Sequence, residues 1–233
     1  MIMKNLAVIP ARSGSKGLPD KNIKLLNNKP LLGYAVEAAI ESGMFDEVMV
    51  STDSDKYAEI AKKCGAKVPF LRSKEMSGDT AGSWDTVKEV LSKYKELGKE
   101  FDTVCLLQPT SPLRSSEDII ASYDVFEQKA SVAVVSVCEM EHSPLWSNTL
   151  PQDGSLADFI RDKSGSRRQD YDTYYRLNGA IYIVDVKALL ESTDLFRCGS
   201  YAYVMPQERS VDIDTQQDFD LASFYLSKQC ENL

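Results

Sequence analysis

The pattern that most constrains this chain is an alternation of short apolar runs with segments of helical periodicity. Apolar runs that are separated by helices predict buried strands of a mostly parallel sheet, covered by helices on both faces. The predicted strands of the first half lie at residues 6–9, 47–52, 67–71, 103–107 and 131–137, and the predicted helices at residues 31–42, 55–64, 83–97 and 117–128. At 233 residues the chain can bury a substantial core, so we predict a single Rossmann-like α/β domain over residues 1–233.

The alternation breaks between about residue 138 and residue 176, where the sequence is polar, of mixed charge and interrupted by proline and glycine. Aromatic residues such as Trp146 and Phe159 need a place to pack, so the segment is not expected to be disordered. We interpret residues 139–175 as an excursion from the sheet that packs on a neighbour, such as a second subunit. Regular structure resumes with strands at residues 180–184 and 201–205, a helix at residues 186–192 and a last helix after Asp214, with Thr215 as its N-cap.

Composition excludes several classes of protein. The net charge of −8, from 27 basic and 35 acidic residues, disfavours a general binder of nucleic acid or of anionic membranes. No apolar run approaches the roughly 20 residues needed to span a bilayer, and the first run ends at Pro10, so we expect no signal peptide. The five cysteines are scattered, without a C-x-x-C pair or a Cys/His metal spacing, which disfavours disulfides and zinc. Reduced thiols suit the cytoplasm, the location that we predict.

A basic loop that contains two glycines follows the first predicted strand. It holds Arg12, Lys16 and Lys21 together with Gly14 and Gly17. Glycine lets the backbone approach a ligand closely, and cations with free amides suit a polyanion, so a nucleoside triphosphate is the first ligand to consider. The spacing is neither that of a Walker A loop nor the full dinucleotide fingerprint. The alternative is a solvated turn that is merely basic, but strand-end loops of α/β sheets are where ligands usually bind.

Two further groups of polar residues have both a structural and a functional interpretation. After the fourth predicted strand, a double-proline loop either presents donors at the carboxyl edge of the sheet or forms only a turn and a helix cap; its polar residues are Gln108, Thr110, Ser111 and Arg114. Arginines within and after the excursion either form a solvated face or bind a carboxylate; they are Arg161, Arg167, Arg168 and Arg176, with Gln169 among them.

Asp212 and Asp214 give the most specific of these signals for a ligand site. In an extended strand, residues two apart point to the same side, so both carboxylates would face one spot. Like charges held that close are unfavourable without a cation beside them. Two carboxylates together with phosphate oxygens commonly hold Mg²⁺, whereas the alternative is two solvated acids at a strand end.

Together these segments resemble the acylneuraminate cytidylyltransferases, the CMP-sialic acid synthetases. Residues 9–22, Ile-Pro-Ala-Arg-Ser-Gly-Ser-Lys-Gly-Leu-Pro-Asp-Lys-Asn, are similar to the nucleotide-binding signature of that family. Further similarities follow in the family's order at residues 51–53, 106–114, 140–142, 176–182 and 212–214. The resemblance runs from near residue 5 to near residue 226, and such an ordered series is far more specific than any single motif.

The resemblance implies a fold of the nucleotide-diphospho-sugar transferase type and a nucleotidyl transfer. CTP and a nonulosonic, sialic-type acid would give a CMP-sugar and pyrophosphate. The anomeric hydroxyl would attack the α-phosphorus in line with the departing pyrophosphate, so positioning and charge neutralisation would carry most of the rate. The resemblance also implies Mg²⁺ as cofactor and a homodimer, with residues 139–175 as the dimerisation excursion of a cytidylyltransferase domain. We expect neither a nucleic acid nor a membrane as partner.

Individual roles follow from the same resemblance. The nucleotide would be bound by Arg12, Lys16, Lys21, Asn22, Arg72, Ala81 and Ser83. The sugar acid would be bound by Gln108, Arg168, Gln169, Arg176, Asn178 and Tyr182. Asp212 and Asp214 would carry Mg²⁺. The catalytic residues would be Lys21, Arg12 and Asp212: Lys21 would stabilise charge developing at the α-phosphate, and Asp212 or the metal would help to deprotonate the attacking hydroxyl.

The sequence leaves the acceptor open. Leu177 stands where the family usually has proline between the arginine and the asparagine, and members acting on sialic, legionaminic or pseudaminic acid differ in this region. A synthetase for CMP-legionaminic acid, CMP-pseudaminic acid or another nucleotide-activated sugar is therefore the alternative. A non-catalytic nucleotide-binding regulator is the further alternative, which the presence of Lys21, Asp212 and Asp214 disfavours.

Overall fold

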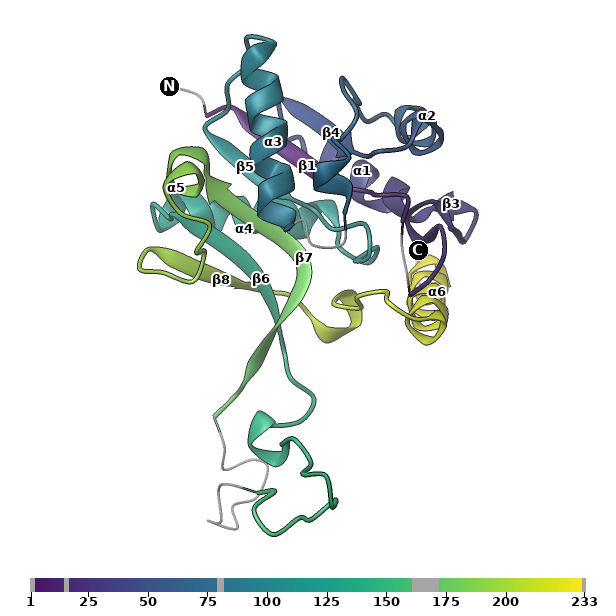
Figure 1. Cartoon of the computed structure of the whole chain (residues 1–233), viewed down its shortest axis with the longest axis vertical. Helices are drawn as coiled ribbons and strands as arrows, with labels where there is room; N and C mark the ends of the chain where they lie inside the picture. The colour runs from purple at the N-terminus through teal and green to yellow at the C-terminus, as the bar shows by residue number, and fades with distance from the viewer. Residues whose placement is uncertain (1–2, 15–16, 79–81, 161–171, 232–233) are drawn as a thin grey trace.

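The computed structural model describes residues 3–14, 17–78, 82–160 and 172–231, and its centre is a six-stranded sheet in the order β4, β1, β5, β7, β6, β8 (Figure 1). The strands are β1 (Asn5–Pro10), β4 (Glu47–Ser51), β5 (Thr103–Leu106), β6 (Ala133–Glu139), β7 (Tyr175–Asp185) and β8 (Ser200–Val204). β7 is antiparallel to its neighbours β5 and β6, whereas the pairs β1–β4, β1–β5 and β6–β8 are parallel. The predicted mostly parallel sheet is confirmed.

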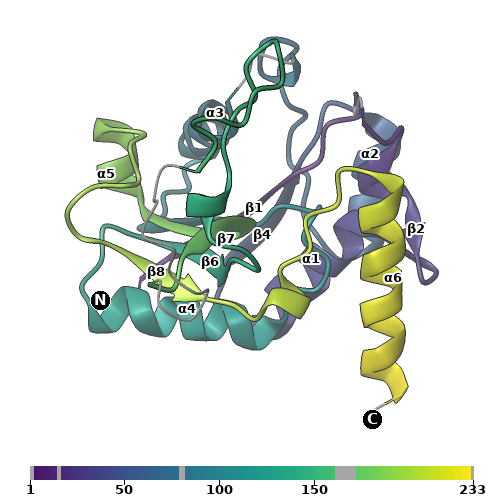
Figure 2. The same cartoon turned by 90° about the horizontal axis from the view of Figure 1, so that it is seen from below.

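Helices cover both faces of this sheet (Figure 2). They are α1 (Leu31–Ser42), α2 (Asp55–Lys63), α3 (Ser83–Glu96), α4 (Ser116–Gln128), α5 (Val186–Glu191) and α6 (Gln216–Glu231). Leu32 of α1 and Tyr123 of α4 belong to the buried cluster on one face, and Val90 of α3 and Leu189 of α5 belong to the cluster on the other. α6 stands beside the sheet, where Phe219 joins a third, smaller cluster. Within the described residues, none of the helices is long and apolar enough to cross a membrane.

Side-chain caps begin several of the helices. Ser54 caps α2, and Ser115 closes a capping box with Asp118 at the start of α4. Thr215, the predicted cap of the last helix, accepts a hydrogen bond from the backbone N–H of Asp218 at 3.3 Å and is thereby confirmed. Each cap satisfies an amide that has no partner within its own helix.

The strand predicted at residues 67–71 is wrong. Lys67 forms an isolated bridge with Met49 at the edge of the sheet, and the ladder does not continue. Pro69 follows two residues later and has no N–H to donate, so the apolar run lies along the sheet edge without extending the sheet.

A short hairpin, β2 (Leu25–Leu26) with β3 (Lys29–Pro30), is absent from the predicted elements. Its turn residues Asn27 and Asn28 have φ of 46° and 65°, a left-handed conformation that asparagine tolerates better than most residues. Each strand has two residues, which is too few to produce a visible alternation of apolar and polar side chains.

The parallel strands β1, β4 and β5 end at one edge of the sheet. The basic loop after β1, the Ser51–Asp53 segment after β4 and the double-proline loop after β5 therefore come together there. This carboxyl edge is where ligands bind in α/β sheets, because adjacent loops diverge and leave a crevice between them.

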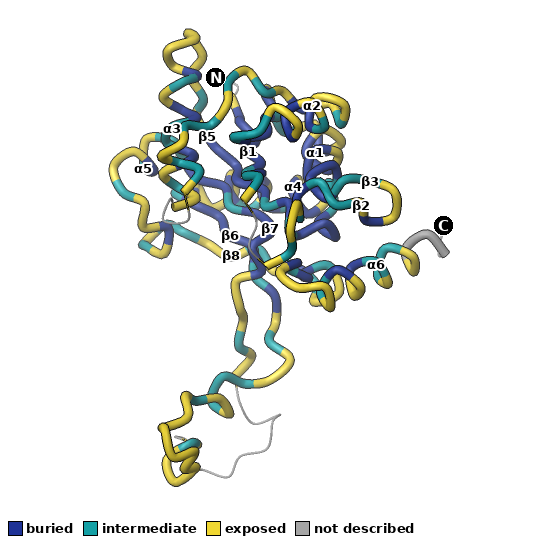
Figure 3. The backbone as a smooth tube through the Cα atoms, turned by 45° about the vertical axis from the view of Figure 1, so that its right-hand side comes forward, coloured by how far each residue is buried: buried dark blue, intermediate teal, exposed yellow. Residues whose placement is uncertain are grey.

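β6 and β7 continue beyond the sheet as a two-stranded ribbon (Figure 1). The described residues of the excursion, 140–160 and 172–174, project away from the body at the end of this ribbon and are mostly exposed (Figure 3). The excursion has its own 3-10 turn, Pro144–Trp146, but little core.

A buried carboxylate at the opposite, amino edge of the sheet provides a test of the fold. Glu47, which is 5% exposed, accepts hydrogen bonds from Lys99 at 2.8 Å, Lys67 at 3.1 Å and the Tyr94 hydroxyl at 3.1 Å. Burial alone would raise the pKa of Glu47, but the bonds from the two lysines outweigh it and hold the pKa below its ordinary value of 4.5.

We predict that Glu47→Gln lowers the free energy of unfolding by about 2 kcal/mol at pH 7, because charge-assisted hydrogen bonds are lost. A depressed folded-state pKa stabilises above the unfolded value, and this contribution disappears as the pH falls through the folded value. The wild-type advantage should therefore shrink below about pH 4.5 in urea denaturation series. An advantage that is constant down to pH 3 would contradict this role of Glu47.

Candidate active site

A cavity of about 430 Å³ opens at the carboxyl edge of the sheet. The predicted site residues that line it are Arg12, Lys21, Asn22, Arg72, Ser83, Gln108 and Asp214. They come from five segments, so the fold brings together residues from across the chain: the loop after β1, the segment between α2 and α3, the start of α3, the loop after β5 and the segment before α6. Lys16, Ala81, Arg168 and Gln169 lie outside the described residues.

The segment after β4 holds the basic loop in place. Asp53 accepts hydrogen bonds from the backbone N–H and the hydroxyl of Ser13 at 2.9 and 3.0 Å. The buried Asn22 donates through Nδ2 to the carbonyl of Arg12 at 3.0 Å. These bonds fix the backbone that carries Arg12, so residues 51–53 act on the site through the loop.

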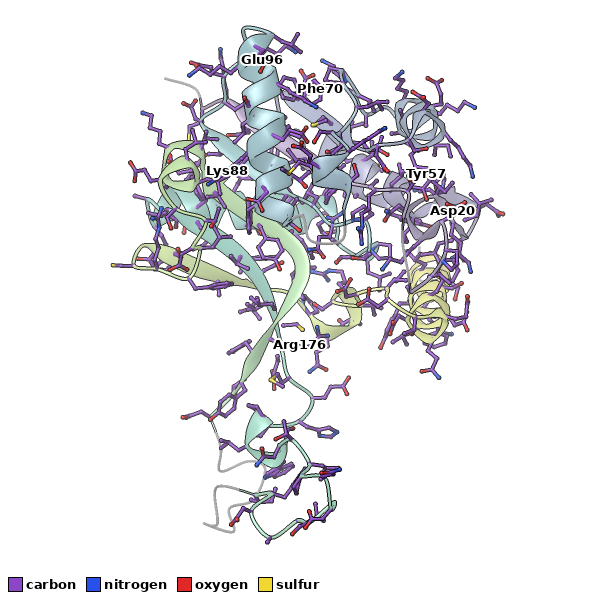
Figure 4. The ribbon with its side chains drawn as sticks, in the orientation of Figure 1. Asp20, Tyr57, Phe70, Lys88, Glu96 and Arg176 are labelled. Carbon is purple, nitrogen blue, oxygen red and sulfur yellow. The ribbon has the colours of Figure 1, made fainter. Side chains whose placement is uncertain are left out.

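A second tie fixes the far end of the same loop. The hydroxyl of Tyr57 on α2 donates to Asp20 at 2.9 Å, and both side chains are labelled in Figure 4. Asp20 has a φ of 52° and precedes the 3-10 turn Lys21–Ile23, so this bond holds the residue that orients Lys21.

Arg72 forms one wall of the cavity. Its guanidinium donates to the hydroxyl of Ser51 at 3.1 Å and to the Ser51 carbonyl at 2.8 Å. Burial lowers the pKa of Arg72 below its ordinary value, the carboxylates of Asp53 and Glu89 oppose this shift, and the positive charge of Arg12 adds to it. Arg12 and Arg72 both line the cavity, so an anion bound there would be stabilised by their positive charge.

Lys21 joins the basic loop to the acidic segment. Its Nζ donates to the carbonyl of Ile213 at 2.6 Å and to Asp214 Oδ1 at 2.8 Å. The Lys21 side chain is 12% exposed, whereas that of Asp214 is 76% exposed. A Cβ on Gly17 would lie 2.9 Å from the Asp214 carbonyl oxygen, so glycine is needed for this close approach of two chain segments.

Asp212 differs from Asp214 in its surroundings. Its Oδ1 is buried without a hydrogen-bond partner among the described residues, and burial raises the pKa of Asp212. The pair does not lie in a strand as predicted; the segment runs outside the sheet, held by a hydrogen bond from the Ile213 N–H to the Thr110 carbonyl at 2.8 Å.

These two acids fit a divalent cation. Asp212 Oδ1 is a buried oxygen without a donor, and Asp214 presents an exposed carboxylate two residues later. In the described part of the chain no group of three or more His, Cys, Asp or Glu side chains is close enough to hold a metal, so further ligands would have to come from a bound phosphate or water.

A bulge in β7 places Gln108 beside Asp212. The register shifts so that Val135 pairs with Tyr182 but Val137 pairs with Leu177. Gly179, in this bulge, has a φ of 75°, and a Cβ there would lie 2.8 Å from Gln108 Oε1 and 3.6 Å from Asp212 Oδ2. Glycine is thus required both for the backbone and for space, and three segments converge at this point.

Asn178 supports the bulge from inside the protein. It is 1% exposed, and its Nδ2 donates to the Ser210 hydroxyl at 3.0 Å and to the Met205 sulfur at 3.2 Å. Its Oδ1 accepts from the Ser136 hydroxyl at 2.6 Å and from the Ala180 N–H at 3.2 Å. The predicted contact of Asn178 with substrate is therefore not supported, because the amide is already fully used.

Arg114 is also structural, although it follows the pocket loop. Its guanidinium is buried and donates to the carbonyls of Gln108 at 3.2 Å and of Ala180 at 2.9 Å, which ties the loop after β5 to the bulge of β7. Burial lowers the pKa of Arg114 to about 10. It therefore cannot present a donor to a ligand at the sheet edge, as the sequence alone allowed.

Three further predicted site residues, Arg176, Tyr182 and Asp212, do not line the cavity. Arg176 is exposed at the root of the β6–β7 ribbon and donates to the Ser210 carbonyl at 3.2 Å (Figure 4). Tyr182 stacks edge-to-face on Trp84, and burial, then the charge of Asp212, raise the pKa of its hydroxyl. Tyr182 is thus near the acids, on the side of Gln108.

Several residues that line the cavity have no ligand-binding role in the sequence-based prediction. They are Pro10, Met76, Gly78, Thr86, Pro109 and Thr110, of which Thr110 is predicted only as a possible donor in the loop. Thr86 was detectable, because it lies three residues after Ser83 on α3 and so shares its helix face. Met76 and Gly78 belong to a 3-10 turn and its cap, for which spacing gives no signal.

Comparison with known proteins identifies the family. A sequence model described as "Cytidylyltransferase" matches residues 6–227. The N-acylneuraminate cytidylyltransferase of Streptococcus agalactiae serotype V is 43% identical over 219 residues, which is 93% of this chain and 52% of the relative. The pseudaminic acid cytidylyltransferase of Campylobacter jejuni is 37% identical over 220 residues, which is 94% of this chain and 95% of the relative. The chain belongs to the cytidylyltransferase family, and the resemblance seen in the sequence is confirmed.

The chain spans about half the length of the curated N-acylneuraminate cytidylyltransferases that it matches. Among solved structures, a CMP:2-keto-3-deoxy-manno-octonic acid synthetase complexed with CTP is similar, with a TM-score of 0.73 and 18% identity over 97% of this chain and 99% of that one. At this identity the likeness concerns the fold alone, and it agrees with the sheet and helix layers described above.

We predict that Gly179→Ala displaces the Gln108 amide with a modest loss of stability. The obstructing atom is the end of a flexible side chain, so the cost should come mainly from the positive φ and amount to about 1–2 kcal/mol. Gly98→Ala is the matched control, because Gly98 has a φ of 73° and nothing within 4 Å of its Cβ position. Urea denaturation should give similar losses for both variants, while a crystal structure should show Gln108 moved only in Gly179→Ala; an unmoved Gln108 would contradict the prediction.

Proposed function

We propose that this chain activates a nonulosonic, sialic-type acid with CTP and releases the CMP-sugar and pyrophosphate. The observation that carries the proposal is the charge arrangement of the cavity in a member of the cytidylyltransferase family. Arg12, Lys21 and Arg72 line the cavity with positive charge, and Asp214 lines it beside Lys21. Asp212, two residues from Asp214, has a buried oxygen and does not itself line the cavity. Such a site suits a triphosphate bound with a divalent cation.

The nucleotide would occupy the side formed by the basic loop and α3. Arg12 and Lys21, with Lys16, would bind the triphosphate, and Asn22, Arg72 and Ser83, with Ala81, would line the nucleoside. Lys21 would exchange Asp214 for a phosphate oxygen, because both are anionic acceptors within reach of the same ammonium group. Lys21 would then stabilise charge that develops at the α-phosphate.

The sugar acid would occupy the side of Gln108. Gln108 and Tyr182 are near Asp212, and Arg176 approaches from the ribbon, with Arg168 and Gln169 of the excursion as further contacts. In-line attack by the anomeric hydroxyl needs little covalent help, so the main task of these residues is to hold the acid in line with the leaving pyrophosphate. Asp212 would accept the hydroxyl proton, and its proximity to Gln108 supports this role.

Asp212 and Asp214 would hold Mg²⁺. When bound, the cation would neutralise phosphate charge and polarise the reacting phosphorus–oxygen bonds. The unpartnered Asp212 Oδ1 supports this assignment from the protein side. The release of Asp214 from Lys21 would make its carboxylate available at the same moment as the nucleotide enters.

A second acceptor deserves a direct comparison. The C. jejuni relative named for pseudaminic acid is covered over 95% of its length, whereas the S. agalactiae relative named for N-acylneuraminate is covered over 52%. The higher sequence identity to the S. agalactiae relative favours N-acylneuraminate, whereas the fuller coverage of the C. jejuni relative favours pseudaminic acid. Both acids therefore belong in the same assay.

We predict that Lys21→Met lowers kcat for pyrophosphate release from CTP by about 100-fold or more, because a charge aimed at the transition state is lost. Lys24→Met is the matched control, since Lys24 donates to Gln216 and does not line the cavity. The assay uses Mg²⁺ with N-acetylneuraminic, legionaminic, pseudaminic and 3-deoxy-manno-octulosonic acids. Normal turnover by Lys21→Met would defeat the catalytic role of Lys21, and absence of release by the wild type with every acid would defeat the proposed reaction.

We also propose a homodimer, with residues 139–175 as the dimerisation excursion of a single domain over residues 1–233. Large apolar side chains of its described part are exposed, among them Leu150 at 62%, Leu156 at 64% and Tyr175 at 50%. Isolated exposed apolar residues are common, but a projecting segment rich in them favours burial against a partner.

We predict that the wild type sediments as a dimer at micromolar concentration and that Leu156→Asp shifts it toward monomer, because a charge would have to be buried in the interface. Leu97→Asp, at an exposed site beyond the end of α3, is the control and should leave the mass unchanged. A monomeric wild type in analytical ultracentrifugation would exclude the dimer.

A further inference from the structure

An ion pair outside the cavity, between a buried carboxylate and a partly exposed arginine, connects the loop after β5 to the segment before α6. Asp118, at the start of α4, has a side chain that is 1% exposed, and Arg209 donates to its two oxygens through Nε at 3.0 Å and Nη2 at 2.7 Å. The Tyr203 hydroxyl donates to the same carboxylate at 3.0 Å. Neither Asp118 nor Arg209 lines the cavity, and the proposed reaction assigns them no part.

Asp118 is fixed to the loop after β5. Its Oδ2 accepts from the Ser115 N–H at 3.0 Å, and its own N–H donates to the Ser115 hydroxyl at 3.3 Å. Ser115 directly follows Arg114, whose bond to the Gln108 carbonyl ties down the start of the same loop. The position of Asp118 is therefore set relative to Gln108 and Thr110.

Arg209 is fixed to the acidic segment. It ends the 3-10 turn Gln207–Arg209, and the buried Ser210 follows with hydrogen bonds from its N–H to the Gln207 carbonyl at 2.9 Å and from its hydroxyl to the Pro206 carbonyl at 2.7 Å. Asp212 lies three residues after Arg209, so the short backbone between them leaves the acids little freedom to move relative to the guanidinium.

The acidic segment needs an anchor because it belongs to neither a strand nor a helix. Asp212 and Asp214 are two residues apart on a segment that runs outside the sheet, so no strand ladder fixes their relative position. Lys21 binds Asp214, but a segment that is free to move would change the spacing of the two carboxylates. A bidentate Arg–carboxylate pair fixes orientation as well as distance, which a single Lys–carboxylate bond does not.

We propose that Arg209 and Asp118 are positioning residues that hold Asp212 and Asp214 at the spacing a divalent cation requires. The proposal rests on the proposed function only in assigning the cation to these two acids. Arg209 acts on the acids through the backbone of residues 209–214, and Asp118 supplies the fixed point on the other loop. Removal of the pair should therefore weaken metal binding more than it weakens nucleotide binding, because Arg12 and Arg72 are held by other bonds.

The test measures binding of Mn²⁺, as a probe for Mg²⁺, by electron paramagnetic resonance with and without CTP. We expect Arg209→Met to raise the Mn²⁺ dissociation constant about tenfold, in the range found for residues that orient metal ligands. Arg209→Lys should fall between Met and wild type, because it keeps the charge but loses one of two bonds. The CTP dissociation constant measured without metal should change less than threefold.

Two comparisons separate positioning from general destabilisation. Glu47→Gln breaks an equally buried carboxylate pair at the amino edge of the sheet and should leave the Mn²⁺ dissociation constant unchanged. Asp118→Asn should weaken Mn²⁺ binding to a similar degree as Arg209→Met, and the double variant should be no weaker than either single one, because both remove the same pair. Arg209→Lys and Asp118→Asn keep the test available if Arg209→Met does not fold.

Unchanged Mn²⁺ affinity in folded Arg209→Met, or equal weakening in Glu47→Gln, overturns the positioning role. Pyrophosphate release by the wild type is measured separately and tests the proposed function. If the wild type turns over CTP and the Arg209 variants bind Mn²⁺ normally, the positioning role is wrong but the proposed function stands. A wild type that binds no Mn²⁺ even with CTP overturns the positioning role together with the metal assignment.

Discussion

The contact between Lys21 and the Ile213–Asp214 segment is the interaction on which the candidate site depends. It joins residues that are 192 and 193 positions apart, and it brings the basic loop of the first strand against the acidic segment that precedes the last helix. Gly17 permits the backbones to approach because it has no Cβ to meet the Asp214 carbonyl. The cavity thus has a cation and a carboxylate in direct contact in its wall, and a bound polyanion with its own cation could replace that contact.

The support behind the cavity is polar. Asn178 is buried with all of its hydrogen-bonding groups used. Arg114 is buried with Nη1 bonded to two carbonyls, while its Nε and Nη2 have no partner among the described residues. Such groups are costly to bury, and the complete set of partners around Asn178 fixes its geometry more firmly. They stabilise the bulge at Gly179, the irregularity that sets Gln108 beside Asp212. A side chain at position 179 would meet the Gln108 amide, whose Oε1 lies 2.8 Å from the Cβ position.

Much of this architecture was predictable because it is local. The alternation of apolar runs with helical segments predicts most of the strands and helices of the sheet in their order along the chain. The position of Thr215 before a helical pattern predicts its role as a cap. The convergence of the loops after β1 and β5 also follows from parallel strands ending at one edge. The strand predicted at residues 67–71 does not form, because Pro69 has no N–H to continue the ladder with β4 although the run is apolar.

The remainder depends on partners that are distant in sequence. In the sequence, Asn178 is a polar residue of a family motif and is therefore predicted to bind substrate. Only the structure shows that it is buried and bonded to Ser136 and Ser210. Asp118 and Arg209 are separated by 91 positions, and neither stands in a recognisable pattern. Burial of a polar side chain is a property of the assembled fold, so spacing along the chain cannot distinguish a supporting residue from one that contacts a ligand.

The central claim is that the cavity joins a sugar acid to the α-phosphate of CTP, and ³¹P nuclear magnetic resonance tests it most directly. The protein is incubated with CTP, Mg²⁺ and each candidate nonulosonic acid in turn. The account predicts that the triphosphate signals disappear while pyrophosphate and a new phosphodiester signal, that of the CMP-sugar, grow in equal amounts with one acid. Release of CMP and pyrophosphate without a phosphodiester, or an unchanged CTP spectrum with every acid, would contradict it.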